Sequence, residues 1–315
     1  ADTTAPTVTG TINANGATDV PINTKVGATF SEGMDPSTIT TTTFTLKQGA
    51  TAIAGTVTYS GVNAVFTPAS NLAANTTYTA TITTGANDLA GNALASNFVW
   101  SWTTGATADT TAPTVTGTIN ANGATNVPIN TKVGATFSEG MDPLTITNVN
   151  FTLKETVTGT AVSGTLSYSG VSAVFIPLSN LANSTGYTVT VKGGTSGVKD
   201  LAGNALAADF VISWTTGATA DTTAPTVSST IPANAATGVA LNTQPTATFS
   251  EAMDPLTITN LTFTVTGPGT TSVSGTVTYV GTTATFSPLS SLAASTLFTA
   301  TITTGAKDLA GNALA

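Results

Sequence analysis

Four carboxylates recur at matching positions of this chain, which is otherwise poor in charge. In the first third of the sequence they are Asp2, Glu32, Asp35 and Asp88. Carboxylate oxygens are hard ligands, and several of them close together suit Ca²⁺, which also accepts backbone carbonyls. Without a cation, neighbouring carboxylates repel one another unless they are spread apart or hydrogen-bonded. These four carboxylates are therefore candidate calcium ligands at one end of a domain.

The same set of carboxylates returns twice more along the chain. The corresponding residues are Asp109, Glu139, Asp142 and Asp200, and then Asp221, Glu251, Asp254 and Asp308. Four in each of three copies make twelve of the fifteen acidic residues. A second interpretation is turn capping, which is common for Asp before proline or in a glycine-containing turn. No EF-hand loop is present, so the sequence leaves both interpretations open.

The carboxylates recur because the chain is a tandem array. The stretch ADTTAPTVTGTINANGATDVPINTKVGATFSEGMDP at 1–36 returns at 108–143 with one change, and again more loosely from 220. Self-similarity of this kind fixes the number of domains. The copies, 1–107, 108–219 and 220–315, each have the length of one compact domain. We expect the small insertions in the second copy to lie in loops.

Composition excludes several classes of protein. Only 7% of the 315 residues are charged, seven lysines face fifteen carboxylates, and the net charge is −8. Nucleic acid binding is not expected, because phosphates are neutralised by clustered Lys and Arg. The chain has no His and no Cys, which removes the common nucleophile and base pairs of enzymes. No catalytic or cofactor-binding residue is predicted, and no apolar stretch reaches the ~20 residues that span a bilayer.

Alternation of apolar and polar residues predicts an all-β protein. In the first copy the expected strands are 7–12, 25–30, 42–47, 55–59, 64–67, 77–83 and 97–103. Seven short strands in one domain are typical of an immunoglobulin-like sandwich. The aromatic residues Phe30, Phe44, Phe66, Tyr78 and Trp102 alternate with Thr or Ser and are the expected core.

Strand parity in such a sandwich locates the carboxylates. Each strand reverses direction, so the second-to-third and sixth-to-seventh strand loops return to the end where the first strand begins. Asp2 precedes the first strand, Glu32 and Asp35 lie in the first of these loops, and Asp88 lies in the other. We expect all four at the pole that adjoins the preceding domain, where a cation would stiffen the joint.

Five motifs in a fixed order carry a family resemblance. They are DTTAP, FSExMDP, FxPxxxLAxxT, DLAGNALA and SWTTG. In this combination the chain resembles the bacterial Ig-like domains of surface-layer proteins and large surface adhesins. The resemblance implies three tandem Ig-like sandwiches in an elongated array and a structural role outside the cell, with no activity. In related adhesin repeats the DTTAP linker and nearby acidic loops can hold calcium.

The third copy differs from the other two at its end. It stops at Ala315, whereas the first copy continues with SNFVWSWTTGATA. We therefore expect the third sandwich to lack its last strand, which leaves an apolar groove and unpaired backbone. The expected reason is that the sequence is a segment of a longer chain.

Two functions from different classes follow. The first is an extracellular spacer, as an adhesin stalk, a filament subunit or a surface-layer component, whose partners are neighbouring repeats or other copies of itself. The alternative is a ligand-binding adhesin module that contacts surface glycan through the two loops of the acidic pole. The loop between the sixth and seventh strands is three residues longer in copy two than in copy one, which weighs against repeated binding of one ligand.

Overall fold

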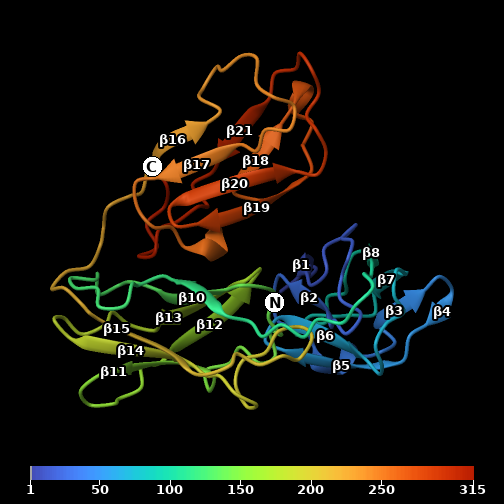
Figure 1. The fold of residues 1–315 in the computed structure, drawn as a ribbon, viewed down its shortest axis with the longest axis horizontal. Helices are drawn as coiled ribbons and strands as arrows, with labels where there is room; N and C mark the ends of the chain where they lie inside the picture. The colour runs from blue at the N-terminus through green and yellow to red at the C-terminus, as the bar shows by residue number, and fades with distance from the viewer. Residues whose placement is uncertain (1) are drawn as a thin grey trace.

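The computed structural model describes residues 2–315, so that Ala1, the first residue of repeat 1, lies outside the described residues. The described chain consists of β-strands and three short 3-10 turns, which confirms the all-β prediction. The strands form separate sheets in repeats 1, 2 and 3 (Figure 1). No helix among residues 2–315 has the length and apolar character needed to cross a bilayer.

Repeat 1 is a sandwich of two antiparallel sheets. One sheet has the order β1-β2-β6-β5 and comprises Val8–Thr11, Val26–Phe30, Asn63–Pro68 and Gly55–Ser60. The other has the order β4-β3-β7-β8 and comprises Thr51–Ala52, Phe44–Gln48, Thr77–Ile82 and Phe98–Thr103. This division of strands is that of the immunoglobulin fold. The seven predicted strands are all present, and β4 is an additional short strand.

Repeats 2 and 3 repeat this plan with one difference. In repeat 2 the sheets are β12-β13-β10-β9, comprising Gly164–Ser169, Ser172–Pro177, Val133–Phe137 and Val115–Thr118, and β11-β14-β15, comprising Phe151–Glu155, Gly186–Val191 and Phe210–Thr215. In repeat 3 the first sheet is β16-β17-β20-β19, comprising Val227–Ile231, Thr246–Phe249, Thr283–Pro288 and Gly275–Val280. Its second sheet has only β18 (Phe263–Thr266) and β21 (Thr299–Ile302). Repeat 3 therefore lacks the seventh strand, as predicted.

Each core lies between the two sheets of its repeat. Along β7 the side chains of Tyr78, Ala80 and Ile82 are buried, whereas their neighbours are more exposed. Trp100 and Trp102 of β8 point inward beside them and are 2% and 1% exposed. The period of two in the sequence thus becomes one apolar and one polar face for each strand.

A partly buried hydrogen bond fixes the acidic loop between the two sheets. The Tyr59 hydroxyl on β5 accepts a hydrogen bond of 2.7 Å from the backbone N–H of Met34. Tyr168 and Tyr279 make the same contact with Met141 and Met253. Burial of its ring raises the pKa of Tyr168 to about 12, against the opposing effect of that hydrogen bond. The loop that carries Glu32 is therefore held against the sheet.

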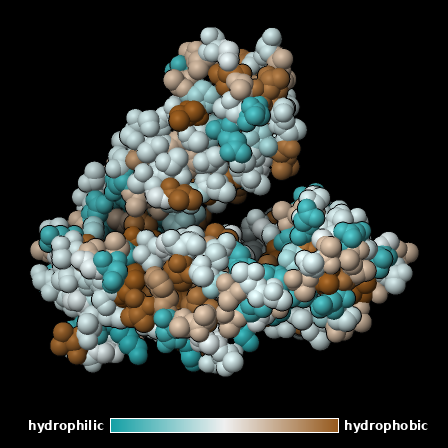
Figure 2. Space-filling view, viewed as in Figure 1, coloured by the Kyte–Doolittle hydropathy of each residue, from teal (hydrophilic) through white to brown (hydrophobic). Residues whose placement is uncertain are grey.

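The three repeats form a bent array. Repeats 1 and 2 follow one another along the long axis of the molecule, and repeat 3, in orange and red, lies beside them (Figure 1). Residues of intermediate hydropathy cover most of the face in Figure 2, where apolar residues form small separate groups. Such a surface agrees with a composition in which 7% of residues are charged.

Candidate functional site

Three carboxylates gather at one pole of each repeat. The clusters are Asp2 with Glu32 and Asp88, Asp109 with Glu139 and Asp200, and Asp221 with Glu251 and Asp308. In each cluster one carboxylate oxygen per residue lies within 4.8 Å of the other two. The start of the repeat supplies the first residue, the loop after the second strand supplies the Glu, and the DLAGN turn supplies the last.

The DLAGN turn holds the innermost carboxylate. Asp88 is 2% exposed, and its carboxylate accepts hydrogen bonds from the backbone N–H groups of Ala90 and Asn92, each at 2.8 Å. The Asn92 side chain donates to the same carboxylate at 2.7 Å and to the backbone carbonyl of Asp2 at 3.3 Å. One asparagine therefore ties the DLAGN turn to the first residues of the repeat. The same contacts recur at Asp200 and Asp308.

In each cluster the pKa of the glutamate is raised. Burial, followed by the charges of Asp109 and Asp200, raises the pKa of Glu139 to about 7. The pKa of Glu251 is raised by the same kinds of cause. At Asp88, burial opposes ionisation, but the hydrogen bonds from Asn92, Ala90 and Gly91 outweigh it and lower the pKa. In repeat 1, hydrogen bonds thus stabilise the charged form of Asp88, whereas the pKa of the neighbouring Glu32 is raised by burial and by the charges of Asp2 and Asp88.

The fourth carboxylate of each set lies outside these clusters. Asp35 caps the 3-10 turn η1 (Pro36–Thr38) by accepting hydrogen bonds from the backbone N–H of Ser37 at 2.9 Å and from its hydroxyl at 2.7 Å. These bonds lower the pKa of Asp35. Asp142 and Asp254 accept equivalent bonds from the N–H groups two residues on, at 3.0 Å. The sequence grouped Asp35, Asp142 and Asp254 with the other carboxylates as metal ligands, whereas the structure places them outside the three clusters, with one oxygen of each held by its own turn.

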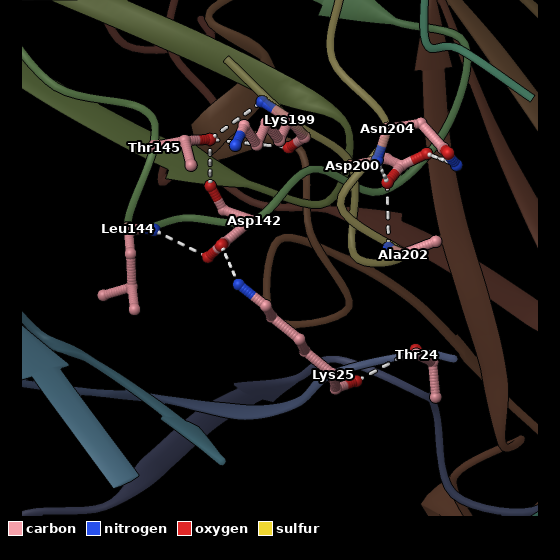
Figure 3. A network of polar contacts seen from close by, with 9 residues as sticks. All are labelled: Thr24, Lys25, Asp142, Leu144, Thr145, Lys199, Asp200, Ala202 and Asn204. Atoms are coloured by element: carbon pink, nitrogen blue, oxygen red, sulfur yellow. Dashed lines mark hydrogen bonds and ion pairs between the residues drawn. The ribbon is translucent and has the colours of Figure 1, made fainter. Parts of the chain in front are cut away.

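Two of these capping aspartates bind a lysine of the preceding repeat. The Lys25 Nζ lies 2.5 Å from a carboxylate oxygen of Asp142, and Lys132 makes the same contact with Asp254. Figure 3 shows Lys25 extending from repeat 1 toward Asp142, beside the turn that carries Asp200. The Asp142 side chain is 3% exposed and the Lys25 side chain 25%. Within residues 2–315, both salt bridges cross a joint between repeats.

Backbone contacts complete each joint. The Asn23 side chain accepts a hydrogen bond from the N–H of Asp109 and donates one to its carbonyl, both at 2.9 Å. The N–H of Lys25 donates to the carbonyl of Leu201, next to Asp200, at 3.1 Å. The segment Asn23-Thr24-Lys25 therefore contacts all three segments that carry the cluster of the next repeat.

The second joint reproduces the first. Asn130 makes the two contacts with Asp221 at 2.8 and 2.9 Å, and the N–H of Lys132 donates to the carbonyl of Leu309 at 3.1 Å. Sequence reasoning did not identify the Asn and Lys of these joints. A signal was available, because INTK precedes the second strand in both repeats and supplies two of only seven lysines.

Several solved structures resemble the chain at low identity. The N-terminal part of the bacterial S-layer protein SbsC covers 67% of this chain and 44% of its own, with 18% identity and a TM-score of 0.28. A longer crystal structure of the same S-layer protein covers 99% of this chain and 54% of its own, with 13% identity and a TM-score of 0.31. The titin domains Z1Z2, solved in complex with telethonin, cover 70% of this chain at 12% identity with a TM-score of 0.23. The chain spans about half the length of the S-layer structures.

The family model described as bacterial Ig-like domain matches the sequence three times. The matched residues are 2–104, 109–216 and 221–315, and each match spans one of the sandwiches described above. No curated protein matches the full sequence significantly. Because the three matches cover nearly the whole sequence, the chain belongs to the bacterial Ig-like domain family, as three consecutive copies.

Proposed function

We propose that the chain is a non-enzymatic spacer of an extracellular bacterial surface protein, in which specific joints hold successive Ig-like repeats at a fixed angle. Membership of the bacterial Ig-like family supports a structural role at the cell surface. The observation that carries the proposal is the repetition of the joint. Two linkers in one chain use the same Asn, the same Lys and the same Asp for the same contacts.

The chemistry of the joint favours a defined docking geometry. Asp142 is a buried carboxylate whose remaining oxygen is satisfied by a lysine that belongs to another domain. Docking buries this carboxylate, because its counterpart Asp35, which meets no preceding repeat among residues 2–315, is only partly buried. The lysine offsets the lost hydration, since a buried group left unsatisfied in the docked state costs about 1–3 kcal/mol, more when it is charged. The Asn23 contacts add two backbone hydrogen bonds across the same joint. Flexible linkers have no need of such contacts, whereas a spacer that transmits orientation does.

We further propose that Ca²⁺ stiffens the joints by binding the three-carboxylate clusters. Asp109, Glu139 and Asp200 supply three hard oxygen ligands, and their segments are the ones that repeat 1 contacts. A divalent cation would offset the repulsion that raises the pKa of Glu139 to about 7. Calcium accommodates the irregular geometry of three chain segments, because its coordination is flexible.

Small-angle X-ray scattering of the full chain tests the spacer function. Alanine substitutions at both joints, N23A/K25A/N130A/K132A, are expected to increase the radius of gyration and to produce the scattering of a flexible particle. The matched control is K47A/K154A, because these lysines occupy equivalent exposed strand positions in repeats 1 and 2. A joint variant that scatters like the unaltered chain would contradict the proposal.

Calorimetric titration tests the calcium proposal separately. The full chain is expected to bind Ca²⁺, and E139Q is expected to weaken binding at one cluster by at least about tenfold through loss of one charged ligand. Asp19 is a suitable control position, because it is exposed and repeat 2 already carries Asn126 there. Absence of binding heat together with an unchanged melting temperature in calcium would refute the calcium proposal and leave the spacer proposal standing.

A further inference from the structure

An Asn-Gly pair lies at the tip of the same turn in repeats 1 and 2. The turns span 14–17 and 121–124, and in each the last N–H donates to the first carbonyl, at 3.0 and 3.1 Å. Gly16 and Gly123 have φ of 79° and 78°, in the left-handed region that glycine enters without a steric penalty. The asparagine before each glycine is exposed. Both pairs are therefore accessible to water.

Such a pair can lose ammonia without an enzyme. The backbone nitrogen of Gly123 gives up its proton and attacks the side-chain carbonyl carbon of Asn122. A new N–C bond closes a five-membered succinimide, the bond to the amide nitrogen breaks, and ammonia leaves with the proton. Water, the only co-reactant, then opens the ring to aspartate or to isoaspartate. Glycine favours this attack, because it has no Cβ beside the nucleophile.

The last strand of each repeat holds both reacting groups in the folded state. In repeat 2 the N–H of Gly123 donates to the carbonyl of Ser213 on β15 at 2.7 Å, and the side-chain carbonyl of Asn122 accepts from the N–H of Ser213 at 2.9 Å. Ser101 on β8 makes the two contacts with the pair of repeat 1, at 2.7 and 3.0 Å. Removal of a proton from a hydrogen-bonded amide needs the local opening that also governs hydrogen exchange. The strand therefore keeps the pair unreactive until it opens.

The pair of repeat 2 also lies next to the carboxylate cluster of repeat 3. A pocket of about 280 Å³ at the second joint is lined by Ala121 and Ala124 of this turn and by Asp221 and Glu251 of the cluster. Burial and the charges of neighbouring aspartates already raise the pKa of Glu251. Deamidation replaces a neutral amide of the turn with a carboxylate, which would be repelled by the cluster.

Repeat 3 has the same turn with a different second residue. Its turn spans 233–236 and closes with the same hydrogen bond, at 3.1 Å. Ala235, with φ of 60°, follows Asn234. The Cβ of Ala235 lies beside the nucleophilic nitrogen and hinders its attack. Repeat 3 thus supplies an internal comparison in which the turn is kept and the reactive pair is absent.

We propose that Asn122 is a site of spontaneous deamidation, that opening of β15 controls the rate, and that the product weakens the joint between repeats 2 and 3. Asn15 is the corresponding site of repeat 1 and reacts when β8 opens. The effect on the joint rests on the proposed function as a spacer with fixed joints, whereas the reaction itself does not depend on that function.

Peptide mapping by mass spectrometry tests the reaction in the full chain. The chain is incubated in mildly alkaline buffer, and the aspartate and isoaspartate products at Asn122 and Asn234 are followed over time. Reaction at Asn122 is expected to be at least about tenfold slower than in a synthetic peptide of residues 118–128. Asn234 is expected to stay intact, as is Asn122 in G123A, which copies the pair of repeat 3. Equal rates in chain and peptide would show that β15 does not control the site.

The substitution W214A tests control by the strand. Trp214 is the buried tryptophan of β15, and its removal is expected to speed deamidation at Asn122 at least about tenfold, while the site in repeat 1 keeps its rate. The matched variant V211A alters the exposed face of the same strand and is expected to leave both rates unchanged. An unchanged rate in W214A, or the absence of product in it, would overturn the proposal.

The substitution N122D tests the effect on the joint. It is expected to quicken exchange of the Asp221 amide, which donates to Asn130 across the second joint, about two- to tenfold. The control N126D adds the same charge at a position where repeat 1 carries Asp19, and is expected to leave this exchange unchanged. Equal exchange in the two variants would refute the effect on the joint. Failure of the fixed joints themselves would instead appear as rapid exchange of this amide in the unaltered chain.

Discussion

At the scale of single residues, each joint contains one ion pair, in a chain of which only 7% of the residues are charged. The carboxylate of Asp142 is satisfied on one side by its own turn and on the other by Lys25. Repeat 3 carries Gln244 where repeats 1 and 2 carry Lys25 and Lys132. The lysine is therefore a feature of the two joints within residues 2–315 and not of every repeat.

The substitution K25Q tests the ion pair with the residue that repeat 3 uses. It leaves the buried Asp142 without its cation, which we expect to weaken the first joint by about 1–3 kcal/mol. Exchange of the Asp109 amide, which donates to the Asn23 side chain, is expected to quicken about ten- to a hundredfold. The exposed Lys47 supplies the control K47Q, which is expected to leave this exchange unchanged. Equal effects of the two variants would show that the ion pair does not hold the joint.

The pH dependence of repeat 2 follows from Glu139. In the folded chain its pKa is about 7, against 4.5 for the ordinary group, so the native state holds this proton more tightly than the unfolded state. The resulting stabilisation is complete below pH 4.5 and is lost as pH rises through 7. In the presence of a chelator, the free energy of unfolding of repeat 2 is therefore expected to fall as the pH is raised from 5 to 8.

Removal of the charge identifies the group responsible. In E139Q the pH dependence over this window is expected to flatten, whereas D19N is expected to retain it because Asp19 is exposed and outside the clusters. Hydrogen exchange of the β10 and β14 amides measures the effect within repeat 2 alone. A slope that persists unchanged in E139Q would show that another group titrates.

At the scale of elements, alternation was sufficient to predict the strands but not the contacts between domains. Each predicted strand of repeat 1 agrees with the structure to within about two residues. The clustering of Asp2, Glu32 and Asp88 also followed from strand parity. The pairing of Lys25 with Asp142 did not, because periodicity within a repeat carries no information about which surfaces of two repeats meet.

The last strand contributes strongly to its sandwich through its inward aromatic residues. Trp102 is 1% exposed, and its indole N–H has no hydrogen-bond partner among residues 2–315, so its contribution is packing. W102A is expected to destabilise repeat 1 by about 3–5 kcal/mol. On the opposite face Val99 is 56% exposed, and V99A is expected to change stability by less than about 0.5 kcal/mol.

Hydrogen exchange in β7 measures both variants in repeat 1, and exchange in β14 reports on repeat 2 at the same time. Faster exchange confined to repeat 1 is the expected result for W102A. A comparable loss in V99A would contradict the assignment of inward and outward faces on β8.

At the scale of the whole molecule, one joint used twice gives the array its shape. The contacts of Asn23 and Lys25 are reproduced by Asn130 and Lys132, so each repeat meets the next through the same surfaces. Repetition of one bent joint produces a curved array, as in Figure 1. The curvature could not be predicted from the sequence, because it depends on the angle at which the two surfaces dock.

The most direct test of fixed joints is a distance distribution between spin labels on neighbouring repeats. The chain has no cysteine, so K47C and K154C introduce two unique labels at exposed positions of repeats 1 and 2. Pulsed electron paramagnetic resonance is expected to give one narrow distance distribution, which broadens when N23A and K25A are added. A broad distribution in the chain with its native joint, or one that the joint substitutions leave unchanged, would contradict the account of a spacer with fixed joints.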